Sequence, residues 1–168
     1  MDLARLTELL SYDPQTGAFT WKVTVGKGVA GTVAGSVRQN RSCSHYRSID
    51  IGIGGKNYRA HRLAWLFVHG SLPDVEVDHI DGDGTNNRIE NLRLATHKQN
   101  GENTKRRRDN VSGRRGVSLH KATGLWRARV SHHGKETCEY FKTFNDAAEA
   151  VDAMRRSAYT HYHGRDLA

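Results

Sequence analysis

The stretch from Val77 to Asn100 constrains the fold of this chain more than any other. An apolar run ends at the pair Asp78-His79, and a segment rich in Gly, Asp and Asn follows, which predicts a tight turn. Residues 89–95 then alternate apolar and polar side chains, which is typical of an extended segment, and a polar helix carrying Asn100 comes next. The pattern therefore predicts a turn between two extended segments, with a helix after them.

The polar side chains of this stretch have a definite chemistry. Asp78 offers a carboxylate and Asn100 an amide oxygen, and such ligands suit a hard cation such as Mg²⁺ or Mn²⁺. His79 beside that ion could take a proton from water, because an imidazole titrates near neutral pH. The amide oxygen of Asn91 could hold the imidazole in one tautomer. A metal, a base and a water together predict hydrolysis, and a phosphodiester is a natural substrate.

The segment resembles the HNH (His-Asn-His) endonuclease motif, in its phage and intron-encoded homing subgroup. The resemblance implies that a two-stranded hairpin and a helix surround one divalent metal. It also implies that His79 is the general base, that Asn91 orients it, and that Asp78 and Asn100 are the metal ligands. The third letter of the motif is Asn here, which this subgroup permits.

Two other interpretations compete for the same residues. A calcium-binding EF-hand loop would place its ligands at regular positions of a twelve-residue loop, but its first position is a histidine here and β-branched residues precede it. A plain polar turn explains residues 81–87 but not the four candidate site residues together. The EF-hand positions would fall on His79, Asp81, Asp83, Gly84 and Glu90.

Composition indicates the partner. Only 36% of the 168 residues are hydrophobic, which favours two modest cores over one large core, and a net charge of +8 favours nucleic acid over a membrane surface. Cys43 and Cys138 form no Cys-x-x-Cys pair, so we expect no structural zinc. Without a signal peptide or a run of 18 apolar residues, we expect an intracellular, cytoplasmic protein of a bacterial host or phage-infected cell, not a secreted one.

Elements around the central stretch follow from their patterns. Residues 2–10 predict a short amphipathic helix, residues 12–17 a turn, and residues 18–25 a strand. Gly54-Gly55 predicts a hairpin between extended segments at 46–53 and 56–60, and residues 61–70 a buried helix. His61 and His69 on that helix are interpreted as packing residues rather than catalytic ones.

Basic residues cluster after the motif, at Arg106, Arg107 and Arg108. We interpret residues 105–111 as a linker that follows the DNA backbone through its charge, with a solvated hinge as the alternative. The composition changes again from Ser112 onward.

Residues 112–168 predict three strands and a helix, at 114–120, 125–131, 136–141 and from Asn145 to about Tyr159. In the middle strand, alternation puts Trp126, Ala128 and Val130 on one side and Arg127 and Arg129 on the other. We expect the helix to cover the side with Trp126 and the arginines to face outward, where they could enter a major groove.

This segment resembles the ethylene-response-factor (APETALA) type of DNA-binding domain. The matching residues are Ser112-Gly-Arg-Arg-Gly-Val-Ser118, Gly124-Leu-Trp-Arg-Ala-Arg-Val130, Gly134-Lys135, Phe141-Lys-Thr-Phe144 and the alanine-rich helix that follows. The resemblance implies that the sheet lies in the major groove and that Arg115, Ser118, His120, Arg127 and Arg129 face DNA. One departure is Cys138-Glu139, which adds a negative charge near that surface.

Together these features predict an α+β chain: a ββα-metal HNH core with N-terminal β-hairpins, linked to a small three-stranded antiparallel sheet packed on one helix. The predicted domains are a nuclease domain at 1–104 with its core at 72–104, a linker at 105–111 and a DNA-binding domain at 112–168. We expect a metal-dependent DNA endonuclease that nicks or prefers certain sites and binds duplex DNA as a monomer or weak dimer. A non-catalytic DNA-binding regulator and a ribonuclease remain alternatives.

Overall fold

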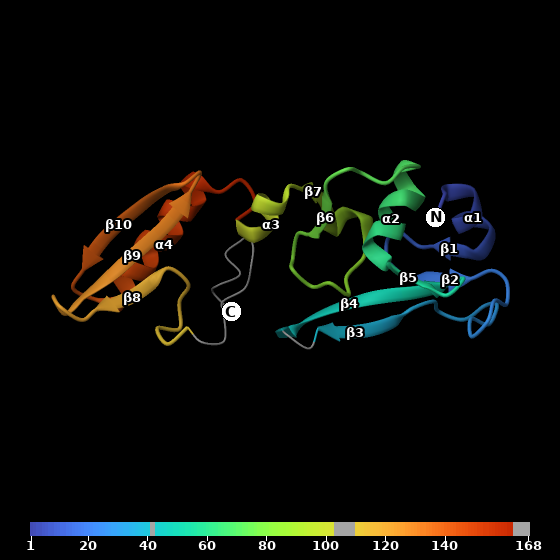
Figure 1. Ribbon diagram of the computed structural model, residues 1–168, viewed down its shortest axis with the longest axis horizontal. Helices are drawn as coiled ribbons and strands as arrows, with labels where there is room; N and C mark the ends of the chain where they lie inside the picture. The colour runs from blue at the N-terminus through green and yellow to red at the C-terminus, as the bar shows by residue number, and fades with distance from the viewer. Residues whose placement is uncertain (41–42, 103–109, 163–168) are drawn as a thin grey trace. The chain divides into compact units, whose positions relative to one another are not determined.

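The fold was analysed on a computed structural model, which describes residues 1–40, 43–102 and 110–162. Contacts divide the chain into two compact units, Met1–Thr96 and His97–Ala168, and each is described by itself. Both units combine helices with small antiparallel sheets, so the predicted α+β class is confirmed (Figure 1). No helix among the described residues is long and apolar enough to cross a membrane.

The first unit contains three antiparallel sheets around a central helix. One sheet pairs β1 with β2, one has the order β3-β4-β5, and one pairs β6 with β7. The bounds are α1 Leu3–Leu9, β1 Leu10–Tyr12, β2 Phe19–Trp21, β3 Ser36–Asn40, β4 Cys43–Ile53, β5 Lys56–Arg59, α2 Ala60–His69, β6 Glu76–His79, the 3-10 helix η1 Ile89–Asn91 and β7 Leu92–Ala95.

Local chemistry explains several of these boundaries. The Asp2 carboxylate accepts a hydrogen bond from the backbone N–H of Arg5 and caps α1. Helix α2 ends at Gly70, whose φ of 79° is the left-handed conformation that glycine adopts without a steric penalty. Gly54 and Gly55 also have positive φ, which allows the tight turn between β4 and β5 that the sequence predicted.

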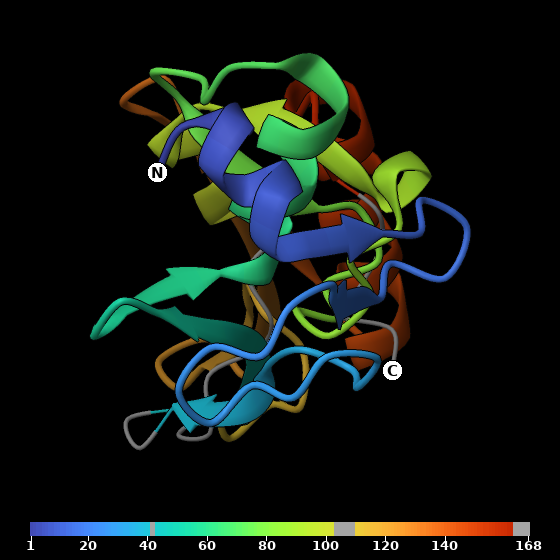
Figure 2. The same cartoon turned by 90° about the vertical axis from the view of Figure 1, so that its right-hand side faces the viewer.

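Helix α2 lies at the centre of the first core. Its buried face, with Leu63, Ala64 and Leu66, packs with α1, with β4 and with the β6 strand. Helices α1 and α2 lie side by side, next to the β1–β2 hairpin (Figures 1 and 2). The core therefore fixes the start of β6, which carries the Asp78-His79 pair.

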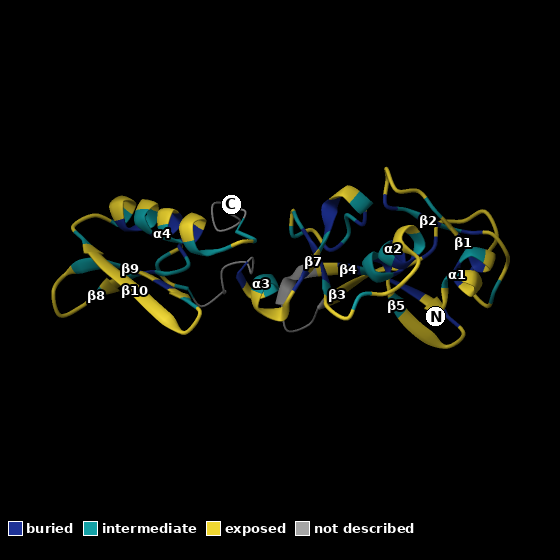
Figure 3. Ribbon diagram, turned by 90° about the horizontal axis from the view of Figure 1, so that it is seen from above, coloured by how far each residue is buried: buried dark blue, intermediate teal, exposed yellow. Residues whose placement is uncertain are grey.

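The second unit is a three-stranded sheet covered on one face by a helix, as predicted. Its strands have the order β10-β9-β8, and all pairs are antiparallel. Val117, Ala128 and Val130 form the core with Ala147 and Val151 of the helix, and the opposite helix face is exposed (Figure 3). The bounds are α3 His97–Glu102, β8 Val117–His120, β9 Leu125–His132, β10 Lys135–Phe141 and α4 Phe144–Ala158.

The structure differs from the sequence predictions at several places, and β8 begins only at Val117 where the strand was expected from residue 114. The strand predicted at 18–25 is only Phe19–Trp21, and β3 lies where polar residues gave no strand signal. Helix α4 begins two residues earlier than expected, because the hydroxyl of Thr143, and not Asn145, accepts the hydrogen bond from the N–H of Asp146.

Candidate active site

His79 is the last residue of β6 and its side chain is almost fully buried, with 3% of it exposed. Its Nε2 lies 3.1 Å from Oδ1 of Asn87. Burial lowers the pKa of His79, while the hydrogen bond to the amide oxygen of Asn87 and the charges of Asp78, Asp81 and Asp83 oppose that shift. The imidazole is therefore neutral near pH 7, which is the form that can accept a proton.

The side chain of Asn91 holds the loop that precedes Asn91 in the chain. It does so instead of making the expected contact with the imidazole. Its Nδ2 donates to Oδ1 of Asp81 at 2.9 Å and to the carbonyl oxygen of Asn86 at 2.8 Å, and its Oδ1 accepts from the backbone N–H of Asp81. Its own carbonyl oxygen accepts from the N–H of Ile80. The amide contact that the sequence analysis expected from Asn91 is thus made by Asn87.

Two carboxylates of the loop between β6 and η1 have structural partners. Asp81 accepts from Asn91, from Asn86 Nδ2 and from the N–H of Asp83, and Asp83 accepts from the N–H and hydroxyl of Thr85. Burial is the largest single influence on the pKa of Asp81, and it raises that pKa. The hydrogen bonds together outweigh burial, so the pKa of Asp81 is lowered. The carboxylates that an EF-hand would need are therefore engaged in shaping the turn.

Asp78 is buried to 8% exposure and pairs with Arg93, the residue directly opposite on β7. Its Oδ2 accepts from Nε and Nη2 of Arg93 at 3.1 and 2.8 Å. Adjacent residues of a strand project to opposite faces, and Asp78 and His79 accordingly have different partners. The carboxylate is an oxygen donor of the kind that a hard divalent cation takes.

His61, at the start of α2, packs against His79. The ring centroids are 4.9 Å apart and nearly perpendicular, and the Nδ1 of His61 is buried without a hydrogen-bond partner. Burial, with the charges of His79, Arg59 and Arg62, lowers the pKa of His61 to about 3. His61 is thus a neutral packing partner of the candidate base, as the sequence analysis interpreted it.

The N-terminal turn supports Asn87 from outside the motif. The hydroxyl of Tyr12 donates to the carbonyl oxygen of Asn87 at 2.7 Å, and the N–H of Ile89 donates to the carbonyl oxygen of Pro14. Gly17 lies so close that a Cβ there would be 2.5 Å from the backbone nitrogen of Arg88. The short β1–β2 connection therefore packs directly against the segment that carries Asn87.

Asn100 lies on α3, which clusters with the second unit, so the four predicted site residues are divided between the two units.

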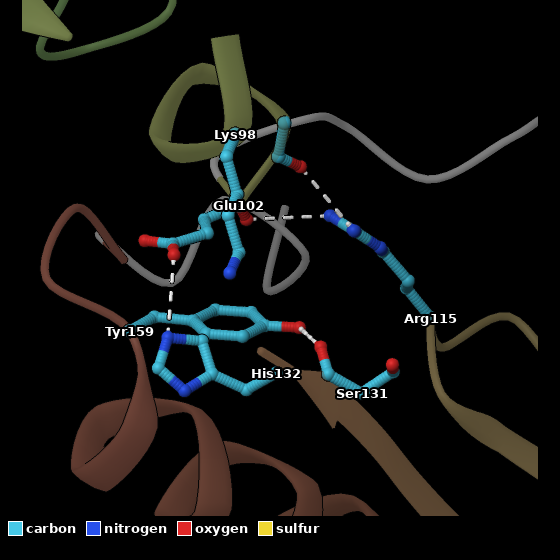
Figure 4. Close-up of a pocket in the computed structure, with 7 residues that line it drawn as sticks. Lys98, Glu102, Arg115, Ser131, His132 and Tyr159 are labelled. Atoms are coloured by element: carbon cyan, nitrogen blue, oxygen red, sulfur yellow. Dashed lines mark hydrogen bonds and ion pairs between the residues drawn. The ribbon is translucent and has the colours of Figure 1, made fainter. Parts of the chain in front are cut away.

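Within the second unit, the Glu102 carboxylate is 3.6 Å from His132 Nε2, and Arg115 donates to the carbonyl oxygens of Gly101 and Glu102 (Figure 4). Arg115, predicted to face DNA, thus caps the end of α3. A pocket of about 130 Å³ is lined by Lys98, Gly101, Glu102, Arg115, Ser131, His132 and Tyr159.

The face of the second sheet opposite α4 carries the other predicted DNA-binding residues. Arg127 and Ser118 are cross-strand partners joined by a hydrogen bond of 3.3 Å, and Arg129 pairs with Glu136 at 3.4 Å. The ring of His120 contacts that of Tyr140 on β10. The predicted separation is therefore confirmed: the apolar side chains of β9 lie under α4 and the arginines on the other face.

Three predicted residues, Arg106, Arg107 and Arg108, lie outside the described residues. Among the residues that the structure describes, no group of three or more His, Cys, Asp or Glu is placed to hold a metal ion.

Sequence reasoning missed Asn87, Arg93 and Tyr12 as parts of the site. Asn87 is one of three asparagines within six residues, and spacing alone does not say which amide reaches the histidine. Arg93 carried a signal, since the hairpin register that pairs His79 with Leu92 also sets Arg93 opposite Asp78. Tyr12 gave none, because its contact with Asn87 joins segments 75 residues apart.

The chain is similar to known proteins over part of its length. Residues 58–102 match the model of the HNH endonuclease family. Protein 3.8 of Escherichia phage T7 is 39% identical over 79 residues, which span 46% of this chain and 65% of that protein. The solved structure of the HNH homing endonuclease I-HmuI, from a study of its DNA binding and cleavage, aligns over 98% of this chain and 93% of its own at 21% identity, but its TM-score of 0.42 is too low to establish a shared fold. Residues 58–102, with the Asp78-His79 pair and its hairpin, are therefore the part of the chain that is similar to the HNH endonuclease family.

Proposed function

We propose that this protein is a metal-dependent DNA endonuclease that hydrolyses phosphodiester bonds, with His79 as its general base. The observation that carries the proposal is a buried imidazole one residue from a buried carboxylate, within the segment that matches the HNH endonuclease family, and burial lowers the pKa of that imidazole. A neutral histidine can take the proton of an attacking water, and burial keeps it from being protonated near pH 7.

One divalent cation, Mg²⁺ or Mn²⁺, would be held by Asp78 and Asn100. When bound, such an ion stabilises the charge that develops on the phosphate and on the leaving oxygen. Arg93 orients the Asp78 carboxylate through its two N–H groups and leaves the second carboxylate oxygen available as a ligand. Asn91 keeps the turn closed behind His79 through its bonds to Asp81 and Asn86.

Duplex DNA is the proposed substrate, and the second unit the part that binds it. The sheet face away from α4, with the exposed Arg129 and the half-buried Ser118, His120 and Arg127, supports this, together with the net charge of +8 and the basic run at 106–108. One base and one metal site cut one strand, so a monomer should produce nicks in duplex DNA.

The test compares the wild-type protein with His79→Ala on supercoiled plasmid in Mg²⁺ or Mn²⁺. We expect nicked circles from the wild type and a loss of at least about 100-fold in rate for the variant, because general-base catalysis contributes on that order. Affinity for DNA, measured without metal, should be unchanged.

His69→Ala is the matched control, since His69 is an exposed histidine on α2 that stacks on Trp65 away from His79. Cleavage by His79→Ala at the wild-type rate would exclude this base. Binding of plasmid without any nicking by the wild type would instead support a non-catalytic DNA-binding regulator. Cleavage of RNA but not DNA would support a ribonuclease.

A further inference from the structure

Helix α3 is short and depends on contacts with the rest of the second unit. It spans His97–Glu102, and six residues are too few for a helix to be stable on its own, because forming the first turn is costly. Its partners must therefore supply what its length does not. They come from three places in the second unit: the segment before β8, the end of β9 and the segment after α4.

Arg115, in the segment before β8, binds the C-terminal end of α3. Its Nη1 donates to the carbonyl oxygen of Glu102 and its Nη2 to that of Gly101, both at 3.3 Å (Figure 4). The last carbonyl groups of a helix have no partner within the helix, and a positive charge beside them is favourable. Arg115 thus gives α3 both the donors and the charge that its end requires.

The core of the second unit fixes the backbone of Arg115. Its carbonyl oxygen accepts from Nη2 of Arg155 on α4 at 2.8 Å, and Arg155 is only 2% exposed. The next residue, Gly116, has a φ of 83°, and its carbonyl oxygen accepts from the N–H of Arg129 on β9. The backbone that carries Arg115 is therefore bound to α4 and to β9 at once.

The Glu102 carboxylate makes a second set of contacts. Its Oε1 lies 3.6 Å from Nε2 of His132, the last residue of β9, and its Oε2 accepts from the N–H of His161 at 3.4 Å. The carboxylate belongs to a residue that is only 7% exposed, and burying such a group without partners would be costly. These contacts indicate that the end of α3 is packed into the second unit.

Asn100 lies between these contacts. Gln99, directly before it, donates through Nε2 to the hydroxyl of Thr160 at 3.2 Å, and Gly101, directly after it, is bound by Arg115. Both chain neighbours of Asn100 are therefore bound to the second unit, which fixes the position of its backbone.

We propose that Arg115 is a positioning residue, which holds α3 on the second unit and so sets the place from which Asn100 is offered as a metal ligand. The inference rests on the proposed function for the role of Asn100, whereas the hold on α3 is a property of the second unit itself. Arg115 lies outside residues 58–102, which match the HNH family. It also gains a task other than the DNA contact that the sequence analysis expected.

The first experiment measures the hold on α3 without any cleavage. Hydrogen exchange of the full-length chain is followed by mass spectrometry at neutral pH, without DNA or metal. In Arg115→Ala, the backbone N–H groups of α3 should exchange at least about 10-fold faster than in the wild type, because two hydrogen bonds are lost, and those of α4 should be unchanged. Arg156→Ala is the matched control, since it removes an exposed arginine of α4, and it should leave α3 as in the wild type.

Arg115→Lys is the milder variant, because an ammonium keeps the charge but not the two forked donors. It should exchange α3 at a rate between those of the wild type and Arg115→Ala. If Arg115→Ala loosens the whole second unit, Arg115→Lys decides the question: we expect exchange of α3 about 2- to 5-fold faster than in the wild type with α4 unchanged, and a wild-type rate for α3 would overturn the proposal.

The second experiment separates a positioning role of Arg115 from a DNA contact. Affinity for duplex DNA, measured by fluorescence anisotropy without metal, should be the same in Arg115→Ala as in the wild type, with the same salt dependence. Binding of Mn²⁺ alone, measured by electron paramagnetic resonance, should weaken by about 10-fold, because loss of a residue behind a metal ligand commonly costs that much. The Mn²⁺ concentration for half-maximal nicking should rise by the same factor.

Wild-type exchange of α3 in Arg115→Ala, together with weaker DNA binding, would overturn the proposal, since Arg115 would then be a DNA contact. Faster exchange with unchanged Mn²⁺ affinity and unchanged nicking would refute the link to Asn100. If the wild type nicks no plasmid, the proposed function is removed, and the exchange rates still decide whether Arg115 holds α3.

Discussion

Single residues in the first unit are held by specific polar partners rather than by general burial. His79 has Asn87, Asp78 has Arg93, and Asn91 has the backbone of its own loop. His79, Asn87, Asp78 and Asn91 are each at least nine-tenths buried, and a buried polar group without a partner would lose about 1–3 kcal/mol. One nitrogen departs from this pattern, the Nδ1 of His61.

His61 makes stability depend on pH. Its pKa is lowered from 6.5 to about 3 in the folded chain, so the unfolded chain binds the proton more readily. The stabilising effect is present above pH 6.5 and is lost as the pH falls toward 3. Unfolding by denaturant between pH 7 and 4 should show a loss on the order of a few kcal/mol, and His79, whose pKa burial also lowers, should contribute to it.

His61→Phe should flatten this dependence and leave stability at pH 7 unchanged or higher, because it keeps a ring and removes a buried nitrogen without a partner. His69→Phe, on the exposed end of the same helix, should keep the wild-type slope. An identical slope in the wild type and His61→Phe would contradict this account.

The candidate site was predictable at this scale in its residue types but not in its contacts. Asp78 and His79 were predicted from their place beside a turn of Gly, Asp and Asn, and the structure shows both side chains buried there. The sequence did not predict which of Asn87 and Asn91 contacts His79. Both amides lie in one loop, and only the path of its backbone decides which of them reaches the imidazole.

Two parts of the first unit outside the β6–β7 hairpin pack against the site, namely α2 and the β1–β2 segment. Helix α2 brings His61 to it, and the turn between β1 and β2 brings Tyr12 and Gly17. The alternation in β9 and the turn glycines predicted their elements correctly, because burial on one face leaves a direct trace in the sequence. Strand β3 left no such trace, since its side chains are largely polar and exposed.

Gly17→Ala tests the contact between the turn and the loop. Gly17 has a φ of 75°, and the added methyl group would lie 2.5 Å from the nitrogen of Arg88. We expect a loss of about 2–4 kcal/mol from backbone strain and overlap, measured by thermal or denaturant unfolding.

Gly26→Ala separates the two causes, because Gly26 also has a positive φ, 58°, but no atom lies within 4 Å of its added Cβ. It should lose only the conformational share, roughly 1 kcal/mol. Equal losses in both variants would mean that the packing of Gly17 on the loop contributes nothing.

The whole chain carries a net charge of +8, and its second unit offers arginines on an open sheet face. Composition predicted two modest cores, and the two buried clusters agree with that. The domain limits at 104 and 112 stay a prediction, whereas contacts place α3 with the second unit. Local sequence patterns do not show which unit α3 belongs to, because that depends on the side chains that α3 contacts in the folded chain.

Binding to DNA should depend on the exposed arginines. In the inactive His79→Ala background, Arg127→Ala and Arg129→Ala should each weaken binding to duplex DNA and flatten the salt dependence by about one unit if they contact phosphate. Fluorescence anisotropy at several salt concentrations measures both quantities. Arg5→Ala, on an exposed ion pair of α1, should change neither, and equal effects from all three would remove the special role of the sheet.

The bond from Tyr12 to Asn87 limits how far the segment around His79 can be shortened or transferred to another protein. A fragment limited to residues 58–102 would keep all the motif residues but would lose Tyr12, whose hydroxyl donates to the carbonyl oxygen of Asn87. A shortened fragment that keeps this hairpin, or a transfer of the hairpin into another protein, therefore has to include the N-terminal segment with Tyr12 and Gly17. Otherwise it needs other residues that pack against the loop in their place.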